Sequence, residues 1–160
     1  AFDGPDLAPA ELRGEIDAWN ARIYPDVNNG VYRAGFARTQ EAYDEAVRDL
    51  FATLDVIEAV LSRQPWLCGD RFTEADLRLF PTLAQFDVAY HYAFKCNIRR
   101  LIDYPALWNY ARRIYHRPGV AGTVAFDIYK QGYFSPSELR NPLGIVPAGP
   151  EIDWSLPDEA

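Results

Sequence analysis

A helical repeat between Gln40 and Leu61 constrains the fold more than any other feature of this sequence. Apolar or aromatic residues recur there at alternating steps of four and three: Tyr43, Val47, Leu50, Leu54, Ile57 and Leu61. That spacing places them on one side of an α-helix, as a stripe that must be buried against a neighbour. The helix should stop near Gln64-Pro65, because the residue before a proline disfavours helical backbone. The sequence therefore predicts a long helix packed within a bundle.

An amphipathic pattern also precedes this helix. Residues 11–24 show the same four- and three-residue spacing of apolar side chains. Pro25 should then break or redirect the chain, since proline removes a backbone donor and crowds the preceding turn. The following Asn28-Asn29-Gly30 has the composition of a turn.

A further helix is expected to begin after Thr73. The Thr73 side chain can cap the first turn, and Asp76 can accept a hydrogen bond from the Thr73 amide, as in a capping box. Apolar residues then recur at three- and four-residue steps as far as Tyr90. Pro81 lies inside this pattern and should kink the helix.

The last third of the chain contains two further predicted helices and then a segment rich in proline and glycine. Asp103 is expected to cap a helix with Pro105 in its first turn, and a short helix should follow over residues 121–131. From Ser135 onward, repeated proline and glycine preclude regular helix. No strand pattern rises above chance. The predicted fold is an all-α bundle over residues 1–134 with an extended tail over 135–160, which packs on the domain or on a dimer partner with Trp154 as a candidate anchor.

Composition narrows the possible functions. The 160 residues fit a single domain with a sizeable core. A net charge of -7 disfavours nucleic acid and anionic membranes as partners. No apolar run approaches the roughly 20 residues of a membrane span, and no signal peptide is recognisable.

The two cysteines indicate neither a metal site nor a disulfide scaffold. Cys68 and Cys96 are too far apart in sequence for a metal-type pair, and nothing completes a zinc ligand set. Two cysteines in an acidic, well-cored chain fit a reducing compartment, so a cytoplasmic location is expected. The chain contains no methionine, which suggests that it is part of a longer polypeptide.

Tyrosine is the residue type with the most chemical promise. Tyr32 follows a glycine-containing segment and, with Tyr90 and Tyr133, suggests a site built from phenol hydroxyls. A phenol with an ordinary pKa of about 10 can donate a proton or stabilise an anion at neutral pH, but it cannot serve alone as the nucleophile. The alternative is that these tyrosines are structural, as most of the ten in the chain should be. For His91 and Cys96 a structural role is likewise the simpler interpretation.

Several segments in order along the chain carry a resemblance to a known family. They are Asn28 to Phe36, Phe86-Asp87, Tyr90-His91, Phe94 to Asn97, Asp103 to Pro105, Pro118 to Val120, Thr123-Val124 and Asn141 to Pro147. Together they resemble the glutathionyl-hydroquinone reductases, the xi class of glutathione transferases. The capping box at Thr73 resembles the start of a buried helix in the C-terminal domain of glutathione transferases generally.

The resemblance implies a specific chemistry. Family members carry an N-terminal thioredoxin-like domain with a catalytic cysteine, which is absent from this chain, and use glutathione as co-substrate without a metal. The cysteine attacks the sulfur of a glutathionyl-hydroquinone, and a second glutathione resolves the mixed disulfide. By motif, Tyr32 matches the family's proton donor, and Tyr90 and Tyr133 match the tyrosines that lower the cysteine pKa. The family forms homodimers through the helical domain.

An aromatic-rich cleft should accompany these tyrosines, with Phe36, Phe86, His91 and Phe94 binding the flat ring of the substrate. The sequence departs from the family pattern at Asp127 to Gly132, where Tyr129 is an alternative to Tyr133. Tyr133 is preferred because the helix should give way to the tail there. Two other functions stay open: a conventional glutathione transferase that conjugates electrophiles, and a non-catalytic helical interaction module.

Overall fold

The computed structural model describes residues 4–157, and these contain helices and isolated bridges but no strand. The α-helices are α1 (Arg13–Ile23), α2 (Gly30–Gly35), α3 (Gln40–Leu61), α4 (Glu74–Gln85), α5 (His91–Ala93), α6 (Pro105–Tyr115) and α7 (Phe126–Tyr133). Two π-helices, η2 (Tyr24–Asn28) and η3 (Phe86–Tyr90), continue α1 and α4, and 3-10 turns occupy Ala10–Leu12, Leu101–Asp103 and Ala121–Thr123. The predicted all-α class is confirmed.

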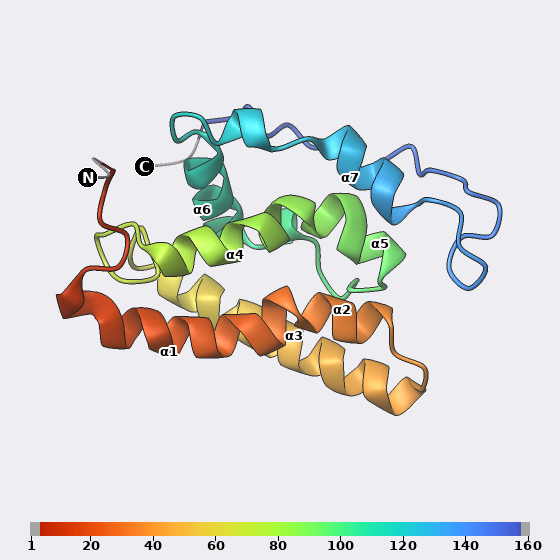
Figure 1. The fold of residues 1–160 in the computed structure, drawn as a ribbon, viewed down its shortest axis with the longest axis horizontal. Helices are drawn as coiled ribbons and strands as arrows, with labels where there is room; N and C mark the ends of the chain where they lie inside the picture. Colours follow the sequence, from red (N-terminus) through yellow and green to blue (C-terminus); the bar gives the residue numbers. More distant parts are fainter. Residues whose placement is uncertain (1–3, 158–160) are drawn as a thin grey trace.

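The long helix α3 buries the predicted stripe. Val47, Leu50, Leu54, Ile57 and Leu61 are all buried on its inner side. In Figure 1, α4 runs through the middle of the molecule, with α1 and α3 on one side and α7 and the tail on the other. The helices α2 and α5 come together at the same end of the bundle. None of the helices in the described residues is both long and apolar enough to cross a lipid bilayer.

The expected break at Pro25 does not occur. The chain passes from α1 through the wider turn of η2 into α2, and the Asn29 amide donates to the Tyr24 carbonyl at 2.8 Å. A π turn leaves more space than an α turn for the proline ring, so the chain stays helical. The predicted turn at Asn28-Asn29-Gly30 is reduced to Asn29, the single residue between η2 and α2, and Tyr32 lies on a helix. At Pro81 the helix was expected to continue with a kink, and α4 does continue through Pro81 to Gln85, whose side-chain amide donates to the Pro81 carbonyl.

The two predicted helix caps have different outcomes. The capping box at α4 is confirmed, since the Thr73 amide donates to Asp76 at 2.8 Å. Asp103, however, does not cap α6. Its carboxylate accepts hydrogen bonds from Arg100, while the first free amides of α6, those of Ala106 and Leu107, donate to Glu58 of α3 at 2.9 and 2.6 Å.

The tail packs on its own domain. Trp154 is 8% exposed and contacts the rings of Trp108, Tyr115 and Phe126. Next to it, Arg112 donates to the Pro157 carbonyl at 2.7 Å. Of the two surfaces expected for the tail, Trp154 thus packs on its own domain, and a dimer contact stays a prediction.

Candidate functional site

Three helix segments bring the predicted tyrosines together at the end of the bundle where α2 and α5 meet (Figure 1). Tyr32 lies in α2, four residues after η2 ends. Tyr90 is the last residue of η3, and Tyr133 is the last residue of α7. Single π turns inside helices are frequent at functional sites, because the extra residue changes which side chains face a given point. Both π turns of this chain adjoin the tyrosine cluster.

The three hydroxyl groups form a closed triangle. The oxygens of Tyr32 and Tyr133 lie 2.6 Å apart, those of Tyr90 and Tyr133 2.8 Å, and those of Tyr32 and Tyr90 3.3 Å. Tyr90 also donates to the side-chain carbonyl of Gln85 at 3.4 Å. The two shorter distances are those of good hydroxyl–hydroxyl hydrogen bonds.

Burial differs among the three phenols. Tyr32 is 37% exposed, whereas Tyr90 is 2% exposed and Tyr133 is intermediate. The pKa of Tyr133 is raised to about 12, first by burial and then by its hydrogen bond with Tyr32. The pKa of Tyr90 is also raised, first by burial and then by its hydrogen bonds to the two other phenols. Both groups therefore stay protonated at neutral pH and remain hydrogen-bond donors.

Phe94 packs against all three tyrosine rings on the buried side of the cluster. Its ring is 2% exposed and lies 5.3 Å from Tyr32, 5.4 Å from Tyr90 and 5.5 Å from Tyr133, measured between centroids. A side chain at Gly35 would collide with this ring, because a Cβ built there lies 2.2 Å from Phe94 Cγ. Glycine at position 35 thus allows α2 to approach the loop after α5.

Phe36 forms the outer wall of the cluster. It is 57% exposed, and its ring is nearly parallel to that of Tyr32, with an interplanar angle of 9°. The guanidinium of Arg140, from the tail, lies 4.4 Å from the centre of the Phe36 ring. The site therefore offers an exposed aromatic face beside phenol hydroxyls.

Known proteins of similar sequence and structure share this architecture. Residues 40–113 match the family model described as glutathione S-transferase, C-terminal domain. Glutathionyl-hydroquinone reductase PcpF of Sphingobium chlorophenolicum is 53% identical over 145 residues, which cover 91% of this chain and 46% of PcpF. A xi-class glutathione transferase from Natrialba magadii is 42% identical with a TM-score of 0.95, over 99% of this chain and 49% of that one.

The chain belongs to the xi-class glutathione transferases. The reductase YqjG of Escherichia coli strain K12 is 46% identical over 152 residues, covering 95% of this chain and 46% of YqjG. The glutathione-bound structure of YqjG matches with a TM-score of 0.95 at 44% identity, over 99% of this chain and 52% of that one. This xi-class chain spans about half the length of the curated relatives it matches.

The tyrosine cluster of this xi-class chain contains some of the predicted ring-binding residues and not others. Phe36 and Phe94 lie at the tyrosine cluster, Phe36 exposed and Phe94 beneath the phenols. Phe86 does not line the site, which corrects the prediction. It is 1% exposed and packs against Phe51 of α3, because it lies about one turn before Tyr90 on the core side of the helix.

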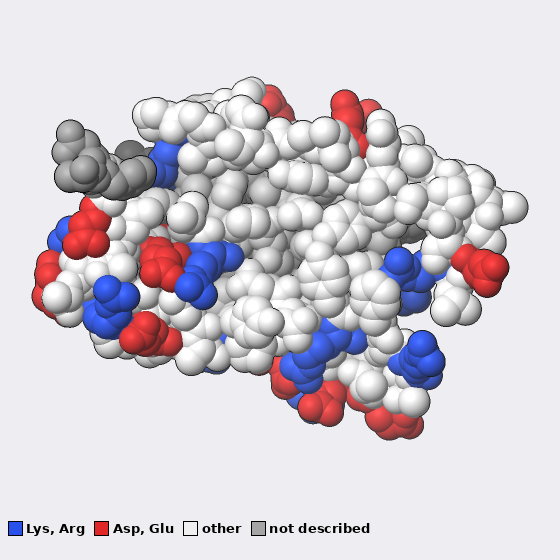
Figure 2. All heavy atoms as spheres, viewed as in Figure 1, with Lys and Arg blue, Asp and Glu red and all other residues white. Residues whose placement is uncertain are grey.

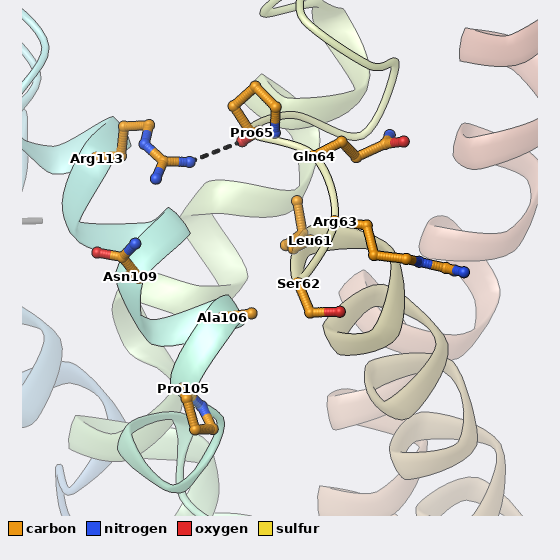
Figure 3. Close-up of a pocket in the computed structure, with 9 residues that line it drawn as sticks. All are labelled: Leu61, Ser62, Arg63, Gln64, Pro65, Pro105, Ala106, Asn109 and Arg113. Atoms are coloured by element: carbon orange, nitrogen blue, oxygen red, sulfur yellow. Dashed lines mark hydrogen bonds between the residues drawn. The ribbon is translucent and has the colours of Figure 1, made fainter. Parts of the chain in front are cut away.

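His91 faces a neighbouring groove between α5 and the tail. This α5–tail groove has a volume of about 610 Å³, and Tyr133 and Arg140 also line it. His91 lies close to the buried carboxylate of Asp87, whose own pKa is raised by burial. A second groove, between the end of α3 and α6, is lined by other residues and shares none with the tyrosine cluster (Figure 3).

Sequence reasoning missed three residues next to the phenols. Gln85 accepts from Tyr90, Arg140 covers Phe36, and Lys95 lines the α5–tail groove with a backbone φ of 57°. Periodicity identifies the helices but says nothing of which tail residue folds back over them. A cluster of three or more His, Cys, Asp or Glu side chains suited to a metal ion does not occur among residues 4–157.

Proposed function

We propose that this chain forms the aromatic-substrate side of a glutathionyl-hydroquinone reductase, which uses glutathione to release hydroquinones from their glutathione thioethers. The observation that carries this proposal is the triangle of hydroxyl groups formed by Tyr32, Tyr90 and Tyr133. The name of the relative PcpF, a glutathionyl-hydroquinone reductase, supports the substrate class. The glutathione-bound structure of YqjG supports glutathione as the co-substrate.

The proposed reaction needs a thiolate from outside this chain. A cysteine of an N-terminal thioredoxin-like domain attacks the sulfur of the thioether, and the bond between that sulfur and the aromatic carbon breaks. The sulfur is oxidised to a mixed disulfide, and the ring carbon keeps the electron pair and needs one proton. A second glutathione thiolate then attacks the glutathione sulfur of the mixed disulfide. Oxidised glutathione leaves, and the cysteine thiolate is restored.

Tyr32 is the proton donor in this proposal. It is the most exposed of the three phenols, and its ring continues the exposed face of Phe36, on which the substrate ring can stack. When Tyr32 gives up its proton, its oxygen can accept hydrogen bonds from Tyr133 and Tyr90 at the distances already present. Donors that are in place before charge develops stabilise it without reorganisation.

Tyr133 and Tyr90 stabilise the attacking thiolate in this proposal. A hydroxyl that donates to a thiolate favours the charged form and lowers the cysteine pKa. Tyr133 can donate directly because it is only half-buried. The buried Tyr90 acts through Tyr133, when its hydroxyl turns from Gln85 to donate to the Tyr133 oxygen. Since the pKa of Tyr133 is about 12, it remains a donor at any pH at which glutathione is a useful reductant.

The experiment is a comparison of Tyr32→Phe with the wild type in the full-length enzyme. We expect kcat for reduction of a glutathionyl-hydroquinone to fall by about 100-fold or more, as is usual when a general acid is removed. The measurement is the release of hydroquinone and of oxidised glutathione. Wild-type turnover in Tyr32→Phe would overturn the assignment of Tyr32.

A matched control is available in the same helical segment. Tyr24, in η2, is 64% exposed, so Tyr24→Phe removes a hydroxyl remote from the triangle and should keep full activity.

The products separate the two enzymatic alternatives: a reductase yields oxidised glutathione and free hydroquinone, whereas a conjugating transferase yields a thioether. Absence of both products in the full-length protein would favour an interaction module.

A further inference from the structure

The α5–tail groove has the features of a binding site for an anion. Lys95 and Arg140 both line it, together with the polar side chains of Asn97 and Asn141. No aspartate or glutamate is among the residues that line it, although the whole chain carries a net charge of -7. Figure 2 shows Lys and Arg side chains at the right-hand end of the molecule, where α2, α5 and the first part of the tail lie, with Asp and Glu side chains at its outer and lower margins.

Arg140 forms no ion pair with a carboxylate of residues 4–157. In the part of the chain that the structure describes, its guanidinium contacts only the rings of Phe36 and Phe94, at 4.4 and 5.7 Å. Five other arginines of the described chain pair with carboxylates, namely Arg33, Arg71, Arg78, Arg99 and Arg100. Others donate to backbone carbonyls, such as Arg13, Arg63 and Arg112. An exposed guanidinium that lies over a ring and makes no ion pair keeps N–H groups available for a carboxylate.

The tail is folded so as to hold Arg140 in place. The Asn141 side chain donates to the carbonyls of Phe134 at 2.6 Å and Ile145 at 3.1 Å, and the Ser137 amide donates to the Asn141 carbonyl. Gly144 has a φ of 63°, a conformation that favours glycine. These contacts close a compact turn with Arg140 on it, so its position does not depend on a flexible loop.

Lys95 occupies a backbone conformation that disfavours its side chain. Its φ of 57° lies in the left-handed region, where glycine or asparagine is usual. The Tyr43 hydroxyl donates to the Lys95 carbonyl at 2.6 Å and helps to fix this conformation. Non-glycine residues held in this region are concentrated at functional sites, and the Lys95 side chain lines the same groove as Arg140.

We propose that the α5–tail groove binds an anionic substituent on the aromatic half of the substrate, and that Arg140 and Lys95 thereby favour hydroquinones bearing a carboxylate. This inference rests on the proposed function. The groove shares Tyr133 with the hydroxyl triangle, and Arg140 reaches from it to Phe36. A ring stacked on Phe36 can therefore direct an acidic substituent toward both cations.

The experiment compares two substrates with the full-length enzyme: the glutathione thioether of unsubstituted hydroquinone and that of 2,5-dihydroxybenzoate. We expect wild-type kcat/KM to favour the carboxylated substrate. In Arg140→Gln the ratio of the two kcat/KM values should fall by about tenfold, and in Lys95→Gln by a smaller factor, as is typical for loss of a charge-assisted contact. Raising the ionic strength should lower the wild-type ratio, because salt screens exposed charges.

Arg63→Gln is the matched control. Arg63 is an exposed residue at the edge of the groove between α3 and α6, and Figure 3 shows its side chain directed away from that groove. It should leave the substrate ratio unchanged. A wild-type enzyme that reduces both substrates equally well, or an Arg140→Gln ratio equal to the wild-type ratio, would overturn this inference while leaving the proposed function intact. Failure of the wild type on both substrates would instead contradict the proposed function itself.

Discussion

At the scale of single residues, the hydroxyl triangle has fewer O–H protons than hydrogen-bond contacts. Three phenols have three O–H donors, but their oxygens make three mutual contacts, and Tyr90 also faces the Gln85 carbonyl. If Tyr90 donates to Gln85 and Tyr133 to Tyr90, then Tyr32 donates to Tyr133, and the contact of 3.3 Å between Tyr32 and Tyr90 is left without a proton. A ligand that accepts from Tyr32 changes these directions without moving the oxygens, which suits a group of donors that act in concert.

Gly35 is the residue on which this arrangement depends most directly. Gly35→Ala would place a methyl group within 2.6 Å of three atoms of the Phe94 ring, and Phe94 contacts all three tyrosines. We expect the free energy of unfolding to fall by about 1–3 kcal/mol, as overpacking of a core does, and kcat/KM to fall with it.

Urea unfolding and steady-state kinetics would measure the two effects. The control is Gly14→Ala in α1, where a Cβ meets nothing within 4 Å. That change should raise stability by about 0.5–1 kcal/mol, because alanine is the better helix former. An equal gain in Gly35→Ala would show that Phe94 moves aside without cost.

At the scale of secondary-structure elements, the caps show which parts of the fold were predictable. The cap of α4 is local, since Thr73 and Asp76 are three residues apart, and the sequence alone revealed it. The cap of α6 comes from Glu58, 48 and 49 residues before the amides that it accepts from. Local spacing cannot identify such a partner, and it pointed instead to the neighbouring Asp103. The π turns escaped prediction for a related reason, because one extra residue per turn hardly changes the apolar pattern.

The role of Glu58 gives a prediction at this scale. In Glu58→Gln, one of the two backbone amides of Ala106 and Leu107 keeps an oxygen acceptor, while the other faces the side-chain NH₂ group. The negative charge at the N-terminus of α6 is also lost. We expect stability to fall by about 1–2 kcal/mol, the typical cost of losing a cap.

Thermal or urea unfolding would test it against Glu45→Gln on the same helix. Glu45 is 65% exposed in its ion pair with Arg33, so its loss should cost no more than about 0.5 kcal/mol. Equal effects of the two changes would indicate that solvent can replace Glu58 at the start of α6.

At the scale of the whole molecule, the tail connects two regions that are distant in sequence. Its first part holds Arg140 at the tyrosine cluster, and its last part packs on α6 through Trp154. The sequence predicted that the tail would be extended and would pack on a surface. It could not show which surface, because a single tryptophan suits a neighbouring subunit as well as its own domain. The convergence of Tyr32, Tyr90 and Tyr133 likewise followed from the family resemblance and not from periodicity, which places each on its own helix only.

The attachment of the tail is testable through Trp154. Its ring centre lies 4.8 Å from that of Trp108 and 5.4 Å from that of Phe126, and the two carbonyls that follow Ser155 accept from His116 and Arg112. Trp154→Ala leaves only these polar contacts, which water can replace. We expect residues 151–156 to lose their protection from amide hydrogen exchange by at least about tenfold, which corresponds to about 1.4 kcal/mol of local stability.

Exchange in α3 and α4 should stay unchanged in Trp154→Ala, because the tail then detaches as a local unit while the bundle remains folded. Leu139→Ala is the control, since Leu139 is 91% exposed in the same tail and should alter neither region. If protection of residues 151–156 survives in Trp154→Ala, the hydrogen bonds from Arg112 and His116 hold the tail without the aromatic cluster. The tail would then depend on α6 for its polar contacts alone, and substitution of Arg112 would become the decisive change.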